Sequence, residues 1–385
     1  MNLTPVINDK RIAVTMGPGG VGKTTIAALL GLQAAVCGRK TLVLTIDPAM
    51  RLAGALGLDR IPPGAHHTIS IAELEAAGVP ARVPLHIAML DTGQSLTGVI
   101  TREVPNSKQQ KRILEHPFFK RLCNDLAGSR EYAAMEELYN LHLKGEFDFV
   151  VVDTPPTTHS MDFLEAPDRI LDVLNNDGYR WLMRPALLAS KVGLRALDFS
   201  GGYVVRTLSK FTGLAFLKEL ASFIDMFSSL MEGFRQRAAA FKAILRSDVS
   251  SFILVTTVDP NQSQETLYLH RKLFSRDLTP AAVVANRVVP EPVALPEVPD
   301  WRQLLTHELV AGRGETEPAV TQLIAAMEIA QQTLADLARR DRAHLEQLKT
   351  SLLNRSSLEV IYLQPEDVHD IRGLEQMRRH VFGQS

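Results

Sequence analysis

A glycine-rich stretch near the start of the chain constrains the fold more than any other part of the sequence. It lies between an apolar run, Ile12 to Met16, and a helix-like run, Ile26 to Cys37, and it fits the pattern G-x-x-x-x-G-K-[ST]. Glycines let successive backbone N–H groups turn toward one anion, and the following helix points its positive N-terminus at the same place. The pattern therefore predicts a phosphate-binding loop (P-loop) between a strand and a helix. Its residues are Gly17, Pro18, Gly19, Gly20, Val21, Gly22, Lys23, Thr24 and Thr25.

Two side chains of the P-loop have predicted roles of their own. Lys23 is expected to reach the β- and γ-phosphates of a bound nucleotide, where its charge would make it a catalytic residue. The Thr24 hydroxyl is expected to bind Mg²⁺.

Composition excludes several classes of protein. The chain has 385 residues, of which 45% are hydrophobic and 22% charged, and its net charge is −1. Such a balance gives no reason to expect nucleic-acid binding. No apolar run reaches the length needed to span a bilayer, and Met1 to Lys10 lacks the apolar part of a signal peptide. We therefore expect a cytoplasmic protein that is not an integral membrane protein. Of the two cysteines, Cys37 and Cys123, we expect Cys37 in the core.

Short β-branched runs alternate with longer helical stretches along the chain. This pattern predicts an α/β fold, a P-loop NTPase with a mostly parallel central sheet flanked by helices. Ligands of such sheets lie at the carboxyl ends of the strands, so the polar residues that end the strands are candidate site residues. The expected strands are Arg11 to Met16, Thr41 to Ile46, Leu85 to Leu90, Phe149 to Val152, Phe252 to Thr256, Ala281 to Ala285 and Leu358 to Leu363.

Asp47 follows the second expected strand and is itself followed by a proline. A carboxylate there would face the phosphate site across one strand. Three interpretations stay open at this point. Asp47 can be interpreted as orienting the water that attacks the γ-phosphate, as hydrogen-bonding to groups that bind Mg²⁺ without binding the ion itself, or as only capping the next helix.

Asp153 and Asn286 end two further expected strands. Four apolar residues before Asp153 fit a Walker B position, in which a carboxylate emerges beside Thr24 and the metal, so we predict Asp153 as a Mg²⁺ ligand. The amide of Asn286 is suited to read an adenine edge with its donor and its acceptor. Asparagine before a loop is also a common turn residue, and this interpretation stays open.

The middle of the chain, residues 169–247, has no convincing strand and predicts a helical insertion. The ATPase core is then expected in two parts, residues 1–168 and 248–385. Seven phenylalanines fall between Phe199 and Phe241 at spacings that put several on one helical face. They either pack helices on each other or line a groove that accepts an apolar helix from a client protein.

A second amphipathic helix is predicted near the C-terminus, from Glu317 to Leu352, and we expect it to pack on the sheet. Its apolar residues keep a spacing of three to four. They are Val320, Leu323, Ile324, Met327, Leu334, Leu337, Leu345, Leu348 and Leu352.

Together these motifs resemble the ArsA-type ATPases, the family of the arsenite-pump ATPase and of the eukaryotic ATPase that delivers tail-anchored membrane proteins. The resemblance covers almost the whole chain from near Arg11. It is carried by the P-loop, Thr45-Ile46-Asp47-Pro48-Ala49, Asp153-Thr154-Pro155-Pro156-Thr157-Thr158-His159, Asn286 with Pro290, and the tail from Gln364 to Glu375.

The resemblance implies a dimer that clamps two ATP molecules, each with Mg²⁺, at the subunit interface. Asp47 would be the water-activating aspartate of the first switch, Asp153 the aspartate that opens the second, and Asn286 the adenine reader. Asp259 falls where the family has an acidic contact to nucleotide, and Pro365 falls in the loop that covers the base.

The sequence also departs from the family pattern. Pro18 stands where members usually carry a lysine that crosses to the partner's phosphates, so a homodimer lacks this cation, and a paralogous subunit that carries the lysine would complete a heterodimer. The cysteine pair for interfacial zinc and the metalloid-site cysteines are also missing.

We expect a Mg²⁺-dependent ATPase whose nucleotide state controls a hydrophobic surface for a helical client or a membrane-protein partner. One alternative is an ATP-dependent dimerisation switch or regulatory subunit without a client. The other is the energising subunit of an anion exporter, against which the missing cysteines argue.

Overall fold

The computed structural model describes residues 3–47, 49, 51–124, 128–175, 230–292, 301–313, 316–353 and 355–383. Eight strands in this part of the chain form one sheet in the order β3-β4-β2-β5-β1-β6-β7-β8. All neighbours are parallel except β3, which runs antiparallel to β4 at the edge. The strands are β1 (Ile12–Met16), β2 (Thr41–Thr45), β3 (His66–Ile69), β4 (Leu85–Met89), β5 (Phe149–Asp153), β6 (Ser250–Thr256), β7 (Pro280–Val288) and β8 (Ser357–Tyr362).

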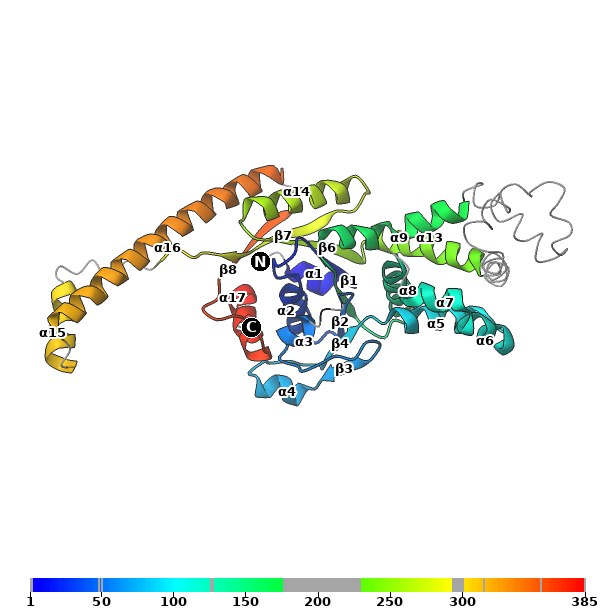
Figure 1. The fold of residues 1–385 in the computed structure, drawn as a ribbon, viewed down its shortest axis with the longest axis horizontal. Helices are drawn as coiled ribbons and strands as arrows, with labels where there is room; N and C mark the ends of the chain where they lie inside the picture. The colour runs from blue at the N-terminus through cyan, green and yellow to red at the C-terminus, as the bar shows by residue number, and fades with distance from the viewer. Residues whose placement is uncertain are drawn as a thin grey trace, which may run out of the picture.

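Helices cover both faces of the sheet (Figure 1). On one face lie α1 (Thr4–Asp9), α2 (Lys23–Val36), α3 (Arg51–Ala55), α4 (Ile71–Ala76) and α17 (Ile371–Phe382). The other face is covered by α8 (Ser129–Lys144), α9 (Thr157–Asn175), α13 (Met231–Arg246), α14 (Pro260–Phe274) and the end of α16 (Glu317–Ser351). Outside these layers lie α5 (Thr92–Glu103), α6 (Ser107–Glu115), α7 (Pro117–Asn124) and α15 (Trp301–Arg313). The predicted α/β class with a mostly parallel sheet is confirmed.

The central strands form where the sequence is apolar on both sides of the pleat. Val43 and Val151 face the α2 layer, and Val14 and Val152 face the opposite layer. A strand buried on both faces needs such a continuous apolar run, which is why the six inner strands are recognisable in the sequence. The seventh expected strand is β8, a half-exposed edge strand. The eighth, β3, was missed because it is a mostly exposed edge strand with only Ile69 fully buried.

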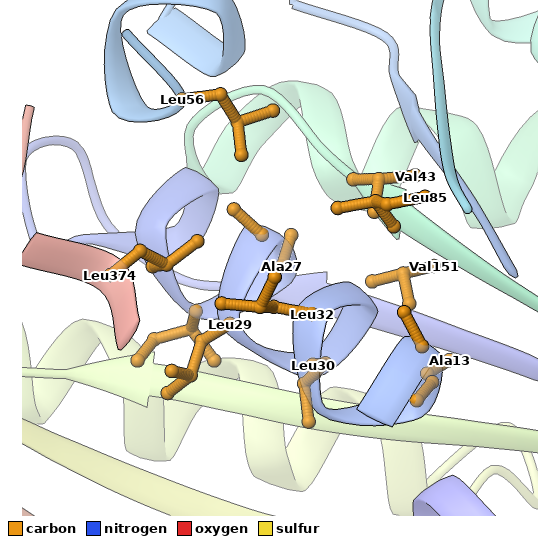
Figure 2. Packing of buried hydrophobic residues seen from close by; sticks show 14 of the residues in the cluster. Ala13, Ala27, Leu29, Leu30, Leu32, Val43, Leu56, Leu85, Val151 and Leu374 are labelled. Carbon is orange, nitrogen blue, oxygen red and sulfur yellow. The ribbon is translucent and has the colours of Figure 1, made fainter. Parts of the chain in front are cut away.

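The P-loop helix α2 is the centre of one core layer. Figure 2 shows Leu29, Leu30 and Leu32 of α2 among side chains of the strands, with Leu374 of α17 beside them. The buried guanidinium of Arg378 on α17 donates to Gln33 of α2 at 2.7 Å and to Glu375. Residues close to the C-terminus therefore hold the helix that begins at the P-loop.

Cys37 is not part of this core, contrary to the expectation from the sequence. It is exposed and serves as the C-cap residue of α2. The apolar face of α2 ends at Val36, so the chain leaves the core layer one residue before the cysteine.

The described ends of the predicted insertion are helical. α9 packs against α13, where Phe163 and Phe241 meet edge to face with ring centroids 5.8 Å apart. Phe234 and Phe241 are buried, so these two phenylalanines belong to the core. Phe199, Phe211, Phe216, Phe223 and Phe227 lie outside the described residues. The insertion's boundaries and its client groove remain predictions.

The helix predicted from Glu317 to Leu352 forms as α16, but the expectation that all of it packs on the sheet is wrong. Among the described residues, only the C-terminal part of α16 contacts the body. There the buried carboxylate of Asp341 accepts a hydrogen bond from the backbone N–H of Val289 at 3.0 Å. With 35 residues, α16 is about 52 Å long. Its first part and α15 project from the body, and we call α15 together with residues 317–337 the helical arm (Figure 1). No helix of the described residues is long and apolar enough to cross a membrane.

Candidate nucleotide site

Glycine is required at two points of the P-loop, which joins β1 to α2. Gly17 has a φ of 153°, and a Cβ there would lie 2.1 Å from the carbonyl oxygen of Val255 on β6. Gly22, the N-cap residue of α2, has a φ of 96°, and a Cβ there would lie 2.3 Å from Nδ2 of Asn286. A side chain at either position would push the loop away from its neighbouring strands.

Three side chains, two from the end of β7 and one from the start of α14, hold carbonyl oxygens of the P-loop. Asn286 donates to Val21 at 2.9 Å, Arg287 to Gly20 at 3.3 Å, and Gln262 to Gly19 at 3.4 Å. In a trans peptide the N–H points away from the carbonyl oxygen, so holding the oxygens on one side turns N–H groups to the other. The loop is thereby set for an anion on its inner side.

A strand irregularity aims two of these side chains at the loop. The pairing of β7 with β8 shifts register between Ala285 and Val288, and Arg287 has a left-handed backbone with a φ of 59°. Such bulges redirect side chains at strand ends. The sequence reasoning missed Gln262 and Arg287, although both come within three residues of a candidate that it did select.

Lys23 lies across the P-loop in a buried position. Its ammonium donates to the carbonyl oxygen of Pro18 at 2.8 Å. Burial lowers the pKa of Lys23, and the nearby carboxylate of Asp153 opposes that shift. A bound phosphate would replace the Pro18 carbonyl as the partner of this charge.

Asp153 lies fully buried at the carboxyl end of β5, level with Thr15 of β1 and Thr45 of β2. The hydroxyls of Thr24 and Thr45 donate to its Oδ2 at 2.9 and 3.0 Å. Its Oδ1 has no hydrogen-bond partner among the described residues. Burial, only partly opposed by these hydroxyls, raises the pKa of Asp153 to about 6.

These donors fit a magnesium ion. Mg²⁺ prefers hard oxygen ligands and is usually held by one or two protein groups together with substrate phosphates. The Thr24 hydroxyl and the unpartnered carboxylate oxygen of Asp153 supply such oxygens next to the P-loop.

Asp47 lies just beyond β2 and is almost buried. Its Oδ1 accepts a hydrogen bond from the backbone N–H of Ala49 at 3.0 Å, and its Oδ2 lies 3.8 Å from the guanidinium of Arg51. The backbone N–H of Asp47 donates to the Thr45 hydroxyl at 3.2 Å, and that hydroxyl donates to Asp153, so Asp47 lies near the phosphate site. The bond to Ala49 is of the capping kind, and Oδ2 is engaged only by the longer contact with Arg51. The catalytic role of Asp47 stays a prediction.

The remaining candidates occupy defined positions, but their roles are untested. Asp259 is the N-cap residue of α14 and accepts hydrogen bonds from the backbone N–H groups of Asn261 and Gln262. Asn286 borders the P-loop, where adenine reading remains its predicted role. Pro365 is exposed in the loop between β8 and α17, where it is predicted to cover the base.

Comparison with known proteins connects this geometry to one family. Residues 10–309 match the family described as anion-transporting ATPase. The chain is 23% identical over 296 residues to a protein named as an arsenical pump-driving ATPase in Aquifex aeolicus, a match that covers 74% of this chain and 64% of that one. It is 25% identical over 277 residues to the ATPase GET3 of Malassezia globosa, covering 72% of each.

A third relative matches over a shorter stretch. A protein of Halobacterium salinarum, also named as an arsenical pump-driving ATPase, is 32% identical over 171 residues, which are 43% of this chain and 25% of that one. The chain thus spans less than two thirds of the two arsenical pump-driving relatives that it matches.

Proposed function

The chain belongs to the anion-transporting ATPase family, and from this premise we propose that it binds ATP with Mg²⁺ and hydrolyses it. The observation that carries the proposal is the convergence of three groups at the carboxyl ends of β1 and β5. The Lys23 ammonium, the Thr24 hydroxyl and the buried, incompletely bonded carboxylate of Asp153 meet beside the P-loop.

Each group has a separate task in this proposal. The P-loop N–H groups and Lys23 bind the β- and γ-phosphates and neutralise their charge. Thr24 and Asp153 would hold Mg²⁺, which, when bound, neutralises charge on the phosphate oxygens. Asp47 orients the attacking water with its carboxylate.

The nucleotide state is proposed to control the helical insertion. Asp153 is separated from the start of α9 by only three residues, and α9 packs along α13, so both described ends of the insertion are tied to the strand end that holds the candidate magnesium ligand. We propose a homodimer that exposes an apolar helical surface when ATP is bound, for a hydrophobic helical client or a membrane-protein partner. The relative named as a pump-driving ATPase supports a membrane-protein partner.

Two substitutions test the nucleotide chemistry. Lys23→Ala should abolish hydrolysis and weaken ATP binding, because it removes the phosphate-binding charge. Asp47→Asn keeps the shape of the side chain but loses the charge, so ATP binding should survive while turnover falls by roughly 10²-fold or more. The measurements are titration with a fluorescent ATP analogue and steady-state phosphate release, with exposed Lys349→Ala as a control for charge loss. Equal loss of ATP affinity in the Lys23 and Asp47 variants would remove Asp47 from the catalytic role.

The client role needs a separate assay. A synthetic transmembrane segment should stay in solution with the protein and Mg·ATP and should precipitate with the Lys23→Ala variant. If ATP instead drives dimerisation while the segment precipitates in every state, the protein is a dimerisation switch without a client.

A further inference from the structure

At its tip the helical arm is held by contacts between α15 and α16, and at its other end α16 joins the body. Near its tip, Val320 and Ile324 of α16 are buried against α15, and Arg302 of α15 donates to Glu328 of α16 at 2.7 Å. Toward the body, Leu348 joins the core of the sheet. Between these two contacts α16 runs without cover from the described chain (Figure 1).

One row of side chains shows that the core-facing side of α16 continues into the uncovered part. Val320, Met327, Leu334, Asp341 and Leu348 are spaced seven residues apart and therefore lie on one side of the helix. Val320, Asp341 and Leu348 are buried, whereas Met327 is 38% and Leu334 is 45% exposed. The helix thus presents to solvent the same side that it buries at both ends.

Four exposed residues and the half-buried Leu337 form a regular apolar stripe. Leu323, Met327, Ala330, Leu334 and Leu337 are spaced by four, three, four and three residues, and we call them the arm stripe. Leu323 is 47% exposed. This spacing is the a/d pattern of a helix that pairs with another helix, and the stripe is about 21 Å long.

The flanks of the arm stripe carry no charge. Ala326, Gln331 and Thr333 border it. The two acids next to stripe residues in the sequence, Glu328 and Asp336, are already paired with Arg302 and Arg339 of the same chain. Charged flanks normally select an oppositely charged partner helix and repel an identical one. Neutral flanks let two copies of the same helix approach without like-charge repulsion.

We propose that a second copy of this chain covers the arm stripe, with the two α16 helices antiparallel about a two-fold axis. In this pairing Leu323 of each copy lies opposite Leu334 of the other, and Met327 lies opposite Ala330. The two outer layers each pair leucine with leucine, and the two inner layers each pair the large Met327 with the small Ala330. The side chains of two copies can therefore pack without gaps or clashes.

The arm contact is distinct from the dimer proposed at the nucleotide site. A stripe on one helix, about 21 Å long, buries much less area than a standard interface of about 1,600 Å². We therefore expect an affinity in the micromolar range or weaker. The contact needs no nucleotide, and it should form in a chain that cannot bind ATP.

Sedimentation of the full chain in EDTA tests the proposal. We expect monomer to convert to dimer as concentration rises, in the Lys23→Ala variant as in the natural sequence. Ala330→Glu puts a carboxylate against the apolar stripe of the second copy and should weaken association at least tenfold. Ala325→Glu makes the same change on the opposite, exposed side of the helix and should leave association unchanged. The proposal is overturned if the natural chain stays monomeric at several hundred micromolar, or if Ala330→Glu and Ala325→Glu weaken association equally.

Disulfide trapping tests the pairing geometry independently of stability. In a chain with Cys37→Ser and Cys123→Ser, the double variant Leu323→Cys/Leu334→Cys should form a covalent dimer under mild oxidation. Within one helix these positions are about 16 Å apart, too far for a disulfide, so any bond must join two copies. Each single variant should remain uncrosslinked, because antiparallel pairing does not bring a position next to itself. Absence of the dimer from the double variant, or equal trapping of a single variant, contradicts the antiparallel contact.

Discussion

Replacing Asp153 with asparagine should stabilise the nucleotide-free protein while removing its response to Mg·ATP. The carboxylate is fully buried, and burial raises its pKa from 3.8 to about 6 despite the hydroxyls of Thr24 and Thr45. A shift of about two units means that the ionised form costs the fold about 3 kcal/mol. In the proposed function this charge serves to bind Mg²⁺.

The pH dependence has a definite sign. The folded state binds this proton more tightly than the unfolded chain, so the cost is absent below about pH 4, grows between pH 4 and 6, and is complete above pH 6. An asparagine carries no charge and lacks this dependence. Its amide oxygen still accepts from Thr24 and Thr45, but its NH₂ group lies where Oδ1 has no partner, which costs about 1 to 2 kcal/mol. The net gain in unfolding free energy at pH 7.5 should be about 1 to 2 kcal/mol.

Urea denaturation in EDTA at pH 7.5 and at pH 4.5 measures this difference. The Asp153→Asn variant should be the more stable protein at pH 7.5 and should lose that advantage at pH 4.5. Adding Mg·ATP should raise the melting temperature of the natural protein and leave the variant nearly unchanged. An Asp153→Asn protein that is less stable at pH 7.5, or a difference that does not change with pH, refutes the reasoning.

Three further outcomes follow from the site and the insertion. In the proposed dimer Pro18 leaves each site without a cross-interface cation, so turnover should lie well below about one per second, and Pro18→Lys should speed hydrolysis and tighten ATP-dependent dimerisation. Arg51, beside Asp47, is the candidate to supply this cation from the partner subunit, so fast natural turnover that is indifferent to Arg51→Ala and to any added partner contradicts this reasoning. Arg287→Ala removes the bond to the Gly20 carbonyl and should weaken ATP binding about two- to tenfold in titration with little change in kcat, with partial recovery in Arg287→Lys. If the insertion is a client groove, hydrogen exchange and hydrophobic-dye binding over residues 211–234 should depend on ATP, and polar substitutions there should reduce client binding without unfolding the chain.

The sheet was predictable because its inner strands are buried on both faces and must therefore be apolar along their whole length. Phe149 to Val152 shows this directly, since alternate side chains enter opposite core layers. β3 was not predicted because an exposed edge strand needs no apolar run. Only one of its four residues is fully buried, so its sequence looks like that of a loop. The strand-end rule likewise places Asp153 beside Thr24, because parallel strands bring their carboxyl ends to one edge.

Two features were beyond the reach of sequence reasoning for different reasons. Gln262 and Arg287 act on backbone carbonyls of the P-loop, and such contacts depend on a helix start and a strand bulge whose geometry leaves no residue pattern. The apolar spacing of α16 revealed which side of the helix would be buried, but not by what. Apolar spacing predicts that one side of a helix is buried, but in the arm stripe the described chain leaves that side largely exposed.

The anchoring of α17 on α2 has a consequence for biosynthesis. A ribosome makes the P-loop and α2 first, yet Leu374, Met377 and Arg378, which complete the layer around α2, emerge more than 330 residues later. Contacts at such separation form late, because the chain must close a very long loop before they stabilise anything. The nascent P-loop helix therefore keeps one apolar side uncovered until α17 has been made and can pack on it.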